Sequence, residues 1–204
     1  MSIDRPQDAG PGIDRTITLT DAVVAIAMTL LILPLVDVSG ELPSNGLPGF
    51  WVENSDVLMS FVISFVVIYV FWTAHGTIFR TLLRSSVEKV PWLSTLNMFW
   101  LLGIASLPFP TALIGREVTT TSAPVYVATM LVISALAAAM LRSVQTAVGA
   151  RRTSLSWLST AVFGLCTVVA FVQPTVALYL LLLLIPAGIL EGRAEHSVAA
   201  RRAG

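Results

Sequence analysis

The sequence contains a single cysteine and few charged residues. Because Cys166 has no second cysteine to pair with, neither an intrachain disulfide nor a cysteine-rich metal site can form, and we expect it to be a small buried apolar residue. Charged residues make up 12% of the chain, against about 25% in soluble domains. The formal net charge is zero, so nothing favours binding to nucleic acid. With 55% hydrophobic residues, the chain is predicted to be a membrane protein that crosses the bilayer several times.

The sequence also lacks the patterns that mark common active sites. It has no His-Glu-x-x-His zinc pair and no Gly-x-Ser-x-Gly elbow. Only His75 lies at membrane depth, since His196 is in the C-terminal tail. We therefore expect neither an enzyme nor a resident cofactor or metal. The Thr-Val-Gly-Tyr-Gly type of carbonyl filter is absent as well, so any pore would need a narrow hydrophobic constriction that gates by dewetting.

Long apolar runs are abundant. A membrane span needs about 20 mostly apolar residues, and four such runs cover residues 17–35, 57–79, 92–114 and 124–141. The charge-free stretch 153–190 would be about 57 Å long as one helix, which is too long for one crossing. Gln173-Pro174 at its middle favours two spans, 155–172 and 175–190. The prediction is one all-α integral membrane domain, residues 1–204, with six transmembrane helices.

The basic residues test this count independently. If the N-terminus is cytoplasmic, eleven of the twelve basic residues fall on the cytoplasmic side, and only Arg116 lies outside. The eleven are Arg5, Arg15, Arg80, Arg84, Lys89, Arg142, Arg151, Arg152, Arg193, Arg201 and Arg202. Since positive charge concentrates on the cytoplasmic side of membrane proteins, both termini are predicted to be cytoplasmic.

The first outer loop, residues 37–56, carries acidic residues and no basic one. Its prolines and glycines predict an irregular connector. An alternative interpretation is an acidic vestibule that raises the local cation concentration.

A few polar residues lie at membrane depth, where such groups are costly and often functional. Asp21 lies one turn into the first span, with Arg15 at its mouth. His75 and Asn97 lie near the inner ends of the second and third spans. Helix capping and snorkelling to the interface would explain the first pair. The shared depth of all four favours a polar network between helices, structural or gating, over catalysis.

One face of the first span is an apolar line with a single hydroxyl. It consists of Ala22, Ile26, Thr29, Leu30 and Leu33. Helical periodicity alone favours ordinary packing for these residues, with the threonine bonded to its own backbone.

Several of these residues carry a resemblance to a known family. The first span reads Arg15-x-x-x-Leu19-Thr20-Asp21 followed by an Ala- and Ile-rich helix. It resembles the Arg-x-x-x-Phe-Ser-Asp signature of the transmembrane protein 175 family, the lysosomal and prokaryotic potassium channels. Phe is replaced by Leu19 and Ser by Thr20. The resemblance extends to Trp72-x-x-His75, to Asn97 and to Leu107-Pro108-Phe109-Pro110-Thr111, and so covers the first three spans.

The resemblance implies a potassium-permeable homotetramer whose first helices line a central pore, with potassium as the permeant ion and no cofactor. By position, Ile26 would be the main hydrophobic constriction, Thr29 the hydroxyl layer linked to potassium preference, and Leu33 the next apolar ring, with Leu30 a further pore contact. Arg15, Asp21, His75 and Asn97 would form the polar network that holds the pore helix. Pro108 and Pro110 would bend the third span.

Two other functions remain open at this stage. The chain could be a proton-conducting channel or a proton-coupled secondary transporter that uses Asp21 and His75, or it could be a non-conducting membrane scaffold. Arginine outnumbers lysine eleven to one, which fits a high-GC bacterial source. The expected location is therefore a bacterial plasma membrane, with lipid as the surrounding partner.

Overall fold

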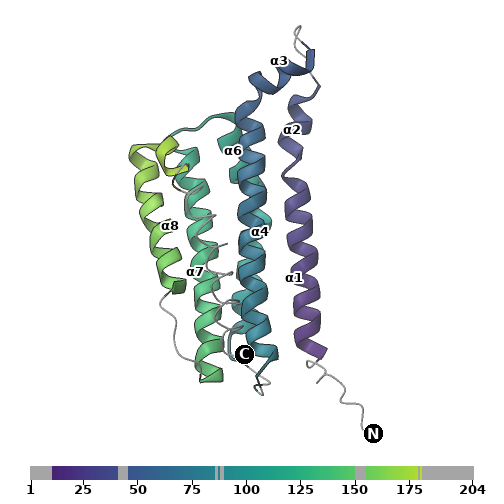
Figure 1. Ribbon diagram of the computed structural model, residues 1–204, viewed down its shortest axis with the longest axis vertical. Coiled ribbons are helices and arrows are strands. Elements are labelled where there is room, and N and C mark those ends of the chain that lie inside the picture. Colours follow the sequence, from purple (N-terminus) through teal and green to yellow (C-terminus); the bar gives the residue numbers. More distant parts are fainter. Residues whose placement is uncertain are drawn as a thin grey trace, which may run out of the picture.

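The computed structural model describes residues 11–40, 46–85, 87, 90–149, 155–178 and 180, and the regular secondary structure within these ranges is entirely helical (Figure 1). In chain order the helices are α1 (Pro11–Leu30), α2 (Leu33–Val38), α3 (Gly46–Glu53), α4 (Ser55–Leu83), α5 (Leu93–Ser106), α6 (Pro108–Arg116), α7 (Ser122–Val148) and α8 (Leu155–Val172). The all-α prediction is confirmed for the part of the chain that the structure describes.

Four helical segments of the described chain are long and apolar enough to cross a membrane. They are Gly12–Val38, Ser55–Leu83, Leu93–Arg116 and Ser122–Val148. They coincide with the first four predicted spans, but the first, second and fourth extend several residues further toward the basic end. The prediction followed the apolar runs, which mark only the part of a helix that meets hydrocarbon, so the more polar helix ends were not included.

The fifth predicted span, residues 155–172, has the bounds of α8. The chain leaves the helix at Gln173, as the Gln-Pro pair predicted, and residues 174–178 are helical again. The Gln173 N–H still donates to the Val169 carbonyl at 2.8 Å, and the Ala177 N–H donates to the Gln173 carbonyl at 3.2 Å. Most of the sixth predicted span, together with residues 1–10 and 181–204, lies outside the described residues.

The first predicted span is not one continuous helix. α1 ends at Leu30, Leu31 and Ile32 form a turn, and α2 begins at Leu33. The predicted span over 17–35 lies within the apolar segment Gly12–Val38. The break inside it follows from Pro34, which has no N–H to continue the bonding ladder. A proline in the first turn of α2 is well tolerated, since the N–H groups of a helix start lack intrahelical acceptors.

The third span is interrupted at Leu107, between α5 and α6. Pro108 stands at the start of α6, and the Leu107 N–H donates to the Ile104 carbonyl at 3.1 Å in a tighter turn. The carbonyl that Pro108 leaves without its usual donor is thereby satisfied. The helix is thus interrupted directly before Pro108, one of the two prolines that were expected to bend the span.

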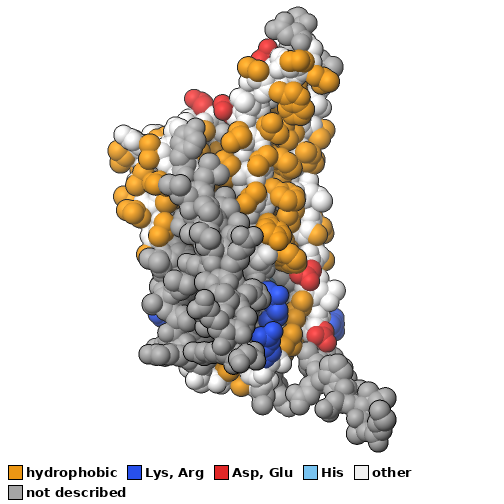
Figure 2. Space-filling view, viewed as in Figure 1, with side chains coloured by type: hydrophobic (Ala, Val, Ile, Leu, Met, Phe, Trp, Pro, Cys, Tyr) orange, Lys and Arg blue, Asp and Glu red, His pale blue; other side chains and the backbone are white. Residues whose placement is uncertain are grey.

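The helices pack as a bundle in which α1 and α2 follow one another along one edge and α8 lies at the opposite edge (Figure 1). α1 packs on α5 and α4, α4 on α6 and α7, and α7 on α5 and α8. Hydrophobic side chains cover much of the visible surface of α1, α2 and α4 (Figure 2). Cys166 is buried, as expected of a small apolar residue.

The outer loop is more ordered than its prolines and glycines predicted. Residues 46–53 form α3, which packs against α4 through the buried side chain of Phe50. Leu47, Trp51 and Val52 remain exposed. Gly46, in the left-handed region with φ of 67°, provides the turn that starts the helix.

Gly115 allows α6 to approach α4 closely. A Cβ at this position would lie 2.7 Å from the Ser60 hydroxyl and 3.4 Å from the Val57 Cα atom. We expect Gly115→Ala to lower the free energy of unfolding by about 1–2 kcal/mol through overpacking, measured as a lower thermal midpoint in detergent. Gly164→Ala is the matched control, because its Cβ would meet only Leu131 Cδ1 at 3.9 Å. Equal midpoints for both variants would refute the steric argument.

Candidate functional site

The two faces of α1 differ sharply. Thr20, Val24, Ala27 and Leu31 are buried, each no more than 2% exposed, and their spacing of three and four residues forms one stripe against α4 and α5. On the other side Ile26 is 59% exposed and Leu33 is 51% exposed. Leu30 and Thr29 lie on this exposed side as well. The line of residues singled out from the sequence therefore faces away from its own subunit.

A chain of hydrogen bonds fixes the buried face of α1 at Thr20. His75 Nε2 of α4 lies 2.6 Å from Asn97 Oδ1 of α5, and Asn97 Nδ2 donates to the Thr20 hydroxyl at 3.2 Å. The Thr20 hydroxyl in turn donates to the Thr16 carbonyl at 2.8 Å. All three side chains are at most 3% exposed. Because Asn97 Oδ1 is an acceptor, His75 carries its proton on Nε2, and three helices are joined in one network.

A second bond joins α1 to α4 beside this chain. Trp72 Nε1 donates to Asp21 Oδ1 at 2.8 Å, so the carboxylate pairs with an indole rather than with His75 or Arg15. Among the described residues, the structure gives the Arg15 side chain no hydrogen bond or ion pair. The structure thus places Asp21, His75 and Asn97 close together where α1, α4 and α5 meet. Arg15, in the second turn of α1, is not part of these hydrogen bonds.

Aromatic rings enclose His75 on both sides, which was not predicted from the sequence. The imidazole stacks on Trp100 of α5 at 4.3 Å between centroids and lies 4.8 Å from the Phe79 ring. Trp100 follows Asn97 by three residues and Phe79 follows His75 by four, so each shares a helix face with a network residue. This spacing is the sequence signal that could have identified them.

A hollow of about 370 Å³ opens beside the network, between α1 and α4. Asp21, Trp72, His75 and Arg80 line it together with apolar side chains. Arg80 turns back onto its own helix, where its Nε donates to the Gly76 carbonyl at 3.2 Å. The middle of α1 therefore borders a cavity lined by both a carboxylate and a guanidinium.

A separate cluster of buried hydroxyls joins α4, α6 and α7 and was not predicted from the sequence. The Ser64 hydroxyl lies 2.9 Å from the Tyr126 hydroxyl and 2.8 Å from that of Thr111. Thr111 is also within 2.8 Å of the Leu107 carbonyl, at the interruption of the third span. The three side chains come from α4, α7 and α6 and are at most 1% exposed. This cluster fixes α6 relative to α4 and α7.

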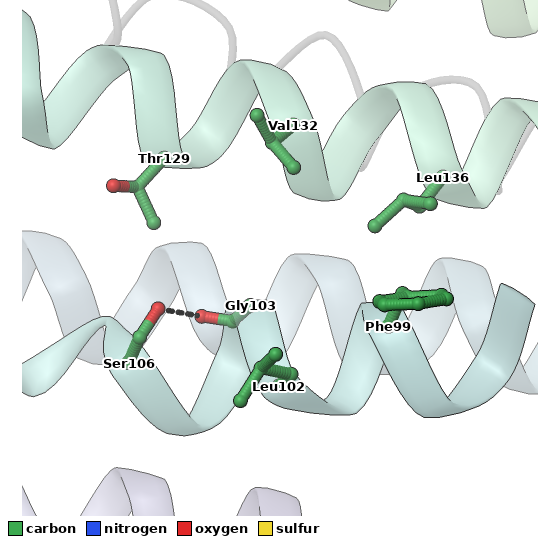
Figure 3. A pocket seen from close by; sticks show the side chains of 7 residues that line it. All are labelled: Phe99, Leu102, Gly103, Ser106, Thr129, Val132 and Leu136. Carbon is green, nitrogen blue, oxygen red and sulfur yellow. Dashed lines mark hydrogen bonds between the residues drawn. The ribbon is translucent and has the colours of Figure 1, made fainter.

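The surface between α5 and α7 contains another hollow, of about 420 Å³ (Figure 3). Phe99, Leu102, Val132 and Leu136 form most of its wall. The Ser106 hydroxyl at its edge donates to the Gly103 carbonyl of its own helix at 2.8 Å. The described residues that line this hollow include no charged side chain, so among them it is an apolar recess between α5 and α7.

These features define an all-helical membrane protein in which a polar network clamps one face of the first helix and leaves the opposite apolar face exposed. Residues 15–108 match the family described as endosomal/lysosomal potassium channel TMEM175. These matched residues run from α1 to the start of α6.

Two known proteins are also similar to this chain. A potassium channel of Streptomyces collinus is 31% identical over 105 residues, which are 50% of this chain and 47% of that protein. The chain thus matches about half the length of this curated relative. A crystal structure of a lysosomal potassium-selective channel TMEM175 homolog from Chamaesiphon minutus superposes with a TM-score of 0.72 over 88% of this chain and 97% of the other. At 20% identity, this similarity establishes the shared fold.

Proposed function

We propose that the protein is a potassium-permeable channel in which four copies of the chain place α1 around a central pore. Each copy would cross a bacterial cell membrane six times with both termini in the cytoplasm. The described basic residues support this orientation, since α1 begins, and α4 and α7 end, at the end of the bundle that holds Arg15, Arg80, Arg84 and Arg142 (Figure 1). The family match and the potassium channel of Streptomyces collinus support potassium as the permeant ion.

The observation that carries the proposal is the exposed face of α1. Ile26, 59% exposed, lies opposite a face that the network and the core hold fixed. Because the buried face is anchored at Thr20 and at Leu31, the exposed face cannot turn inward to hide its side chains. Around a symmetry axis, four such faces would form successive rings.

The rings would have distinct roles. Four Ile26 side chains would form the main constriction and keep the closed pore dry. Thr29, one turn further out, would offer oxygen atoms to an ion that loses part of its hydration. Leu33, with Leu30 between, would form the next apolar ring toward the outside.

The decisive experiment is reconstitution of the purified chain in planar bilayers under opposed potassium and sodium gradients. We expect currents whose reversal potential follows potassium. Thr29→Val keeps the shape and removes the hydroxyl, so the potassium-to-sodium permeability ratio should fall by roughly fivefold. Thr167→Val in α8 is the control, because Thr167 is also bonded to its own helix, at 2.8 Å to the Phe163 carbonyl. Equal potassium-to-sodium permeability ratios in wild type and Thr29→Val would show that the Thr29 hydroxyl does not contribute to selectivity.

The proton-coupled alternative makes a different prediction for Asp21. Asp21→Asn removes the charge and keeps an oxygen that accepts the Trp72 N–H. In a potassium channel we expect the current to stay within roughly twofold of wild type and no flux driven by a pH gradient alone. A proton relay through Asp21 and His75 requires loss of pH-driven flux in this variant. Measuring both vesicle acidification and potassium current for this variant distinguishes a potassium channel from a proton-coupled transporter.

A further inference from the structure

The hollow between α1 and α4 is lined by two opposite charges that do not meet. Its volume is about 370 Å³, and its lining includes the Asp21 carboxylate and the Arg80 guanidinium. That volume falls within the range of small-molecule sites, about 300–1,000 Å³. In the described part of the chain, these two groups form no ion pair with each other. Two separated charges of opposite sign at one cavity suit a ligand that carries both signs itself.

The Asp21 carboxylate has one oxygen left for a cationic donor. Oδ1 accepts the Trp72 N–H at 2.8 Å, and none of the described residues donates to Oδ2. An indole is neutral, so it does not compensate the negative charge. A primary ammonium group would supply the opposite charge together with N–H donors. Trp72 also lines the hollow, and an aromatic ring attracts cations.

The Arg80 guanidinium keeps donors for an anion. Its Nε donates to the Gly76 carbonyl at 3.2 Å, and its Nη2 donates to the Thr77 hydroxyl at 3.4 Å. These bonds hold the group against α4, and its other N–H groups have no acceptor among the described residues. A guanidinium held in this way suits a phosphate, whose oxygens accept N–H groups in pairs.

Both charges mark the point at which the uncharged part of a helix ends. Asp21 is the last charged residue before Asp37, and Arg80 is the first after Asp56, counting Asp, Glu, Lys and Arg. The stretches between them, 22–36 and 57–79, are long and apolar and so belong to the hydrocarbon of the membrane. The hollow therefore lies at the level at which lipid headgroups begin.

We propose that this hollow binds a phosphoethanolamine group, with its ammonium on Asp21 and its phosphate on Arg80. In a phospholipid the two charges of this group are equal and opposite, so one ligand compensates both side chains. Neither a simple anion nor a simple cation does so. The same chemistry is presented by a membrane lipid and by soluble phosphoethanolamine. All the described lining residues belong to one copy of the chain, so the site does not depend on the proposed pore.

The first test compares lipids on the unmodified protein. The purified full chain in detergent is titrated with lipids of identical acyl chains, and bound lipid is counted by native mass spectrometry. We expect phosphatidylethanolamine to bind roughly tenfold more tightly than phosphatidylglycerol, whose headgroup has no ammonium. Phosphatidylcholine should also bind more weakly, because its ammonium has no N–H to donate. Equal affinities for phosphatidylethanolamine and phosphatidylglycerol overturn the inference.

Two variants separate the two ends of the headgroup. Asp21→Asn should weaken phosphatidylethanolamine roughly tenfold and should not weaken phosphatidylglycerol, whereas Arg80→Gln should weaken both lipids. Asp14→Asn and Arg84→Gln are the matched controls, because they remove the same charges from α1 and from the end of α4 at residues outside the described lining. Both controls should bind as wild type does. A preference for phosphatidylethanolamine that persists in Asp21→Asn, or equal losses in the controls, overturns the inference.

Competition distinguishes the two sources of the ligand. If an excess of soluble phosphoethanolamine displaces bound phosphatidylethanolamine, the headgroup alone is sufficient for binding. If bound lipid is not displaced, the acyl chains are needed and the ligand is a membrane lipid. Both results support the site, provided that binding depends on Asp21 and Arg80 as described. Failure of both ligands to bind the wild-type protein overturns it.

Discussion

Ile26→Asn is expected to raise the resting potassium current roughly tenfold, because a ring of amides would hydrate the constriction that isoleucine keeps dry. Among the described large hydrophobic residues of α1, Ile26 is the most exposed, at 59%, and it is not part of the buried core. The substitution should therefore cost the subunit little stability. The measurement is the current of single reconstituted channels at fixed voltage.

Two controls isolate the effect of polarity at Ile26. Ile26→Leu keeps an apolar ring and should leave the resting current near that of wild type. Val168→Asn places the same amide on the exposed surface of α8, where Val168 is 65% exposed, and should not affect conduction. An unchanged resting current in Ile26→Asn, in protein that assembles normally, would remove Ile26 from the conduction path.

His75→Ala is expected to have the largest effect on stability. The variant loses the bond to Asn97 and the contacts with both flanking rings, and it leaves a cavity at a site only 3% exposed. We expect the free energy of unfolding to fall by about 3 kcal/mol. The thermal midpoint of this variant in detergent should therefore be lower than that of wild type. Its ion selectivity should also change, because α1 would be held less firmly.

His75→Phe separates the two contributions. A phenyl ring keeps the stacking between Trp100 and Phe79 and loses only the hydrogen bond to Asn97. Its midpoint should lie between those of wild type and His75→Ala. If His75→Phe were as unstable as His75→Ala, the hydrogen bond alone would account for the effect. A wild-type midpoint for His75→Ala would show that the network does not hold the helices together.

The membrane spans and the polar residues of the network could be predicted because both depend on local sequence. Apolar length located four spans, and the Gln-Pro pair located the end of α8. Asp21, His75 and Asn97 stand out because polar groups are scarce in apolar helices. The exposed face of α1 was visible as a periodic line, but periodicity could not say whether it faced a neighbouring helix, lipid or a pore.

The remaining features depend on how helices are placed relative to one another. Trp100, Ser64 and Tyr126 look like ordinary residues of apolar runs, and only the crossing of α4, α5 and α7 brings them to their partners. Asp21 was expected near His75 or Arg15, yet its carboxylate accepts a hydrogen bond from Trp72. The break at Leu31–Ile32 was missed because Pro34 lies near the end of the predicted span, where a helix could simply have stopped.

The most direct test of the account is the accessibility of α1 to a thiol reagent applied while potassium current flows. Single cysteines at Ile26 and Thr29 would be compared with cysteines at Val62 of α4 and Val168 of α8, which are also exposed in the subunit, in a Cys166→Ala background. We expect a charged methanethiosulfonate to block current through Thr29→Cys, and through Ile26→Cys when the pore is open, and to leave Val62→Cys and Val168→Cys unaffected. Block from α4 or α8 with none from α1 would contradict a pore lined by the first helix.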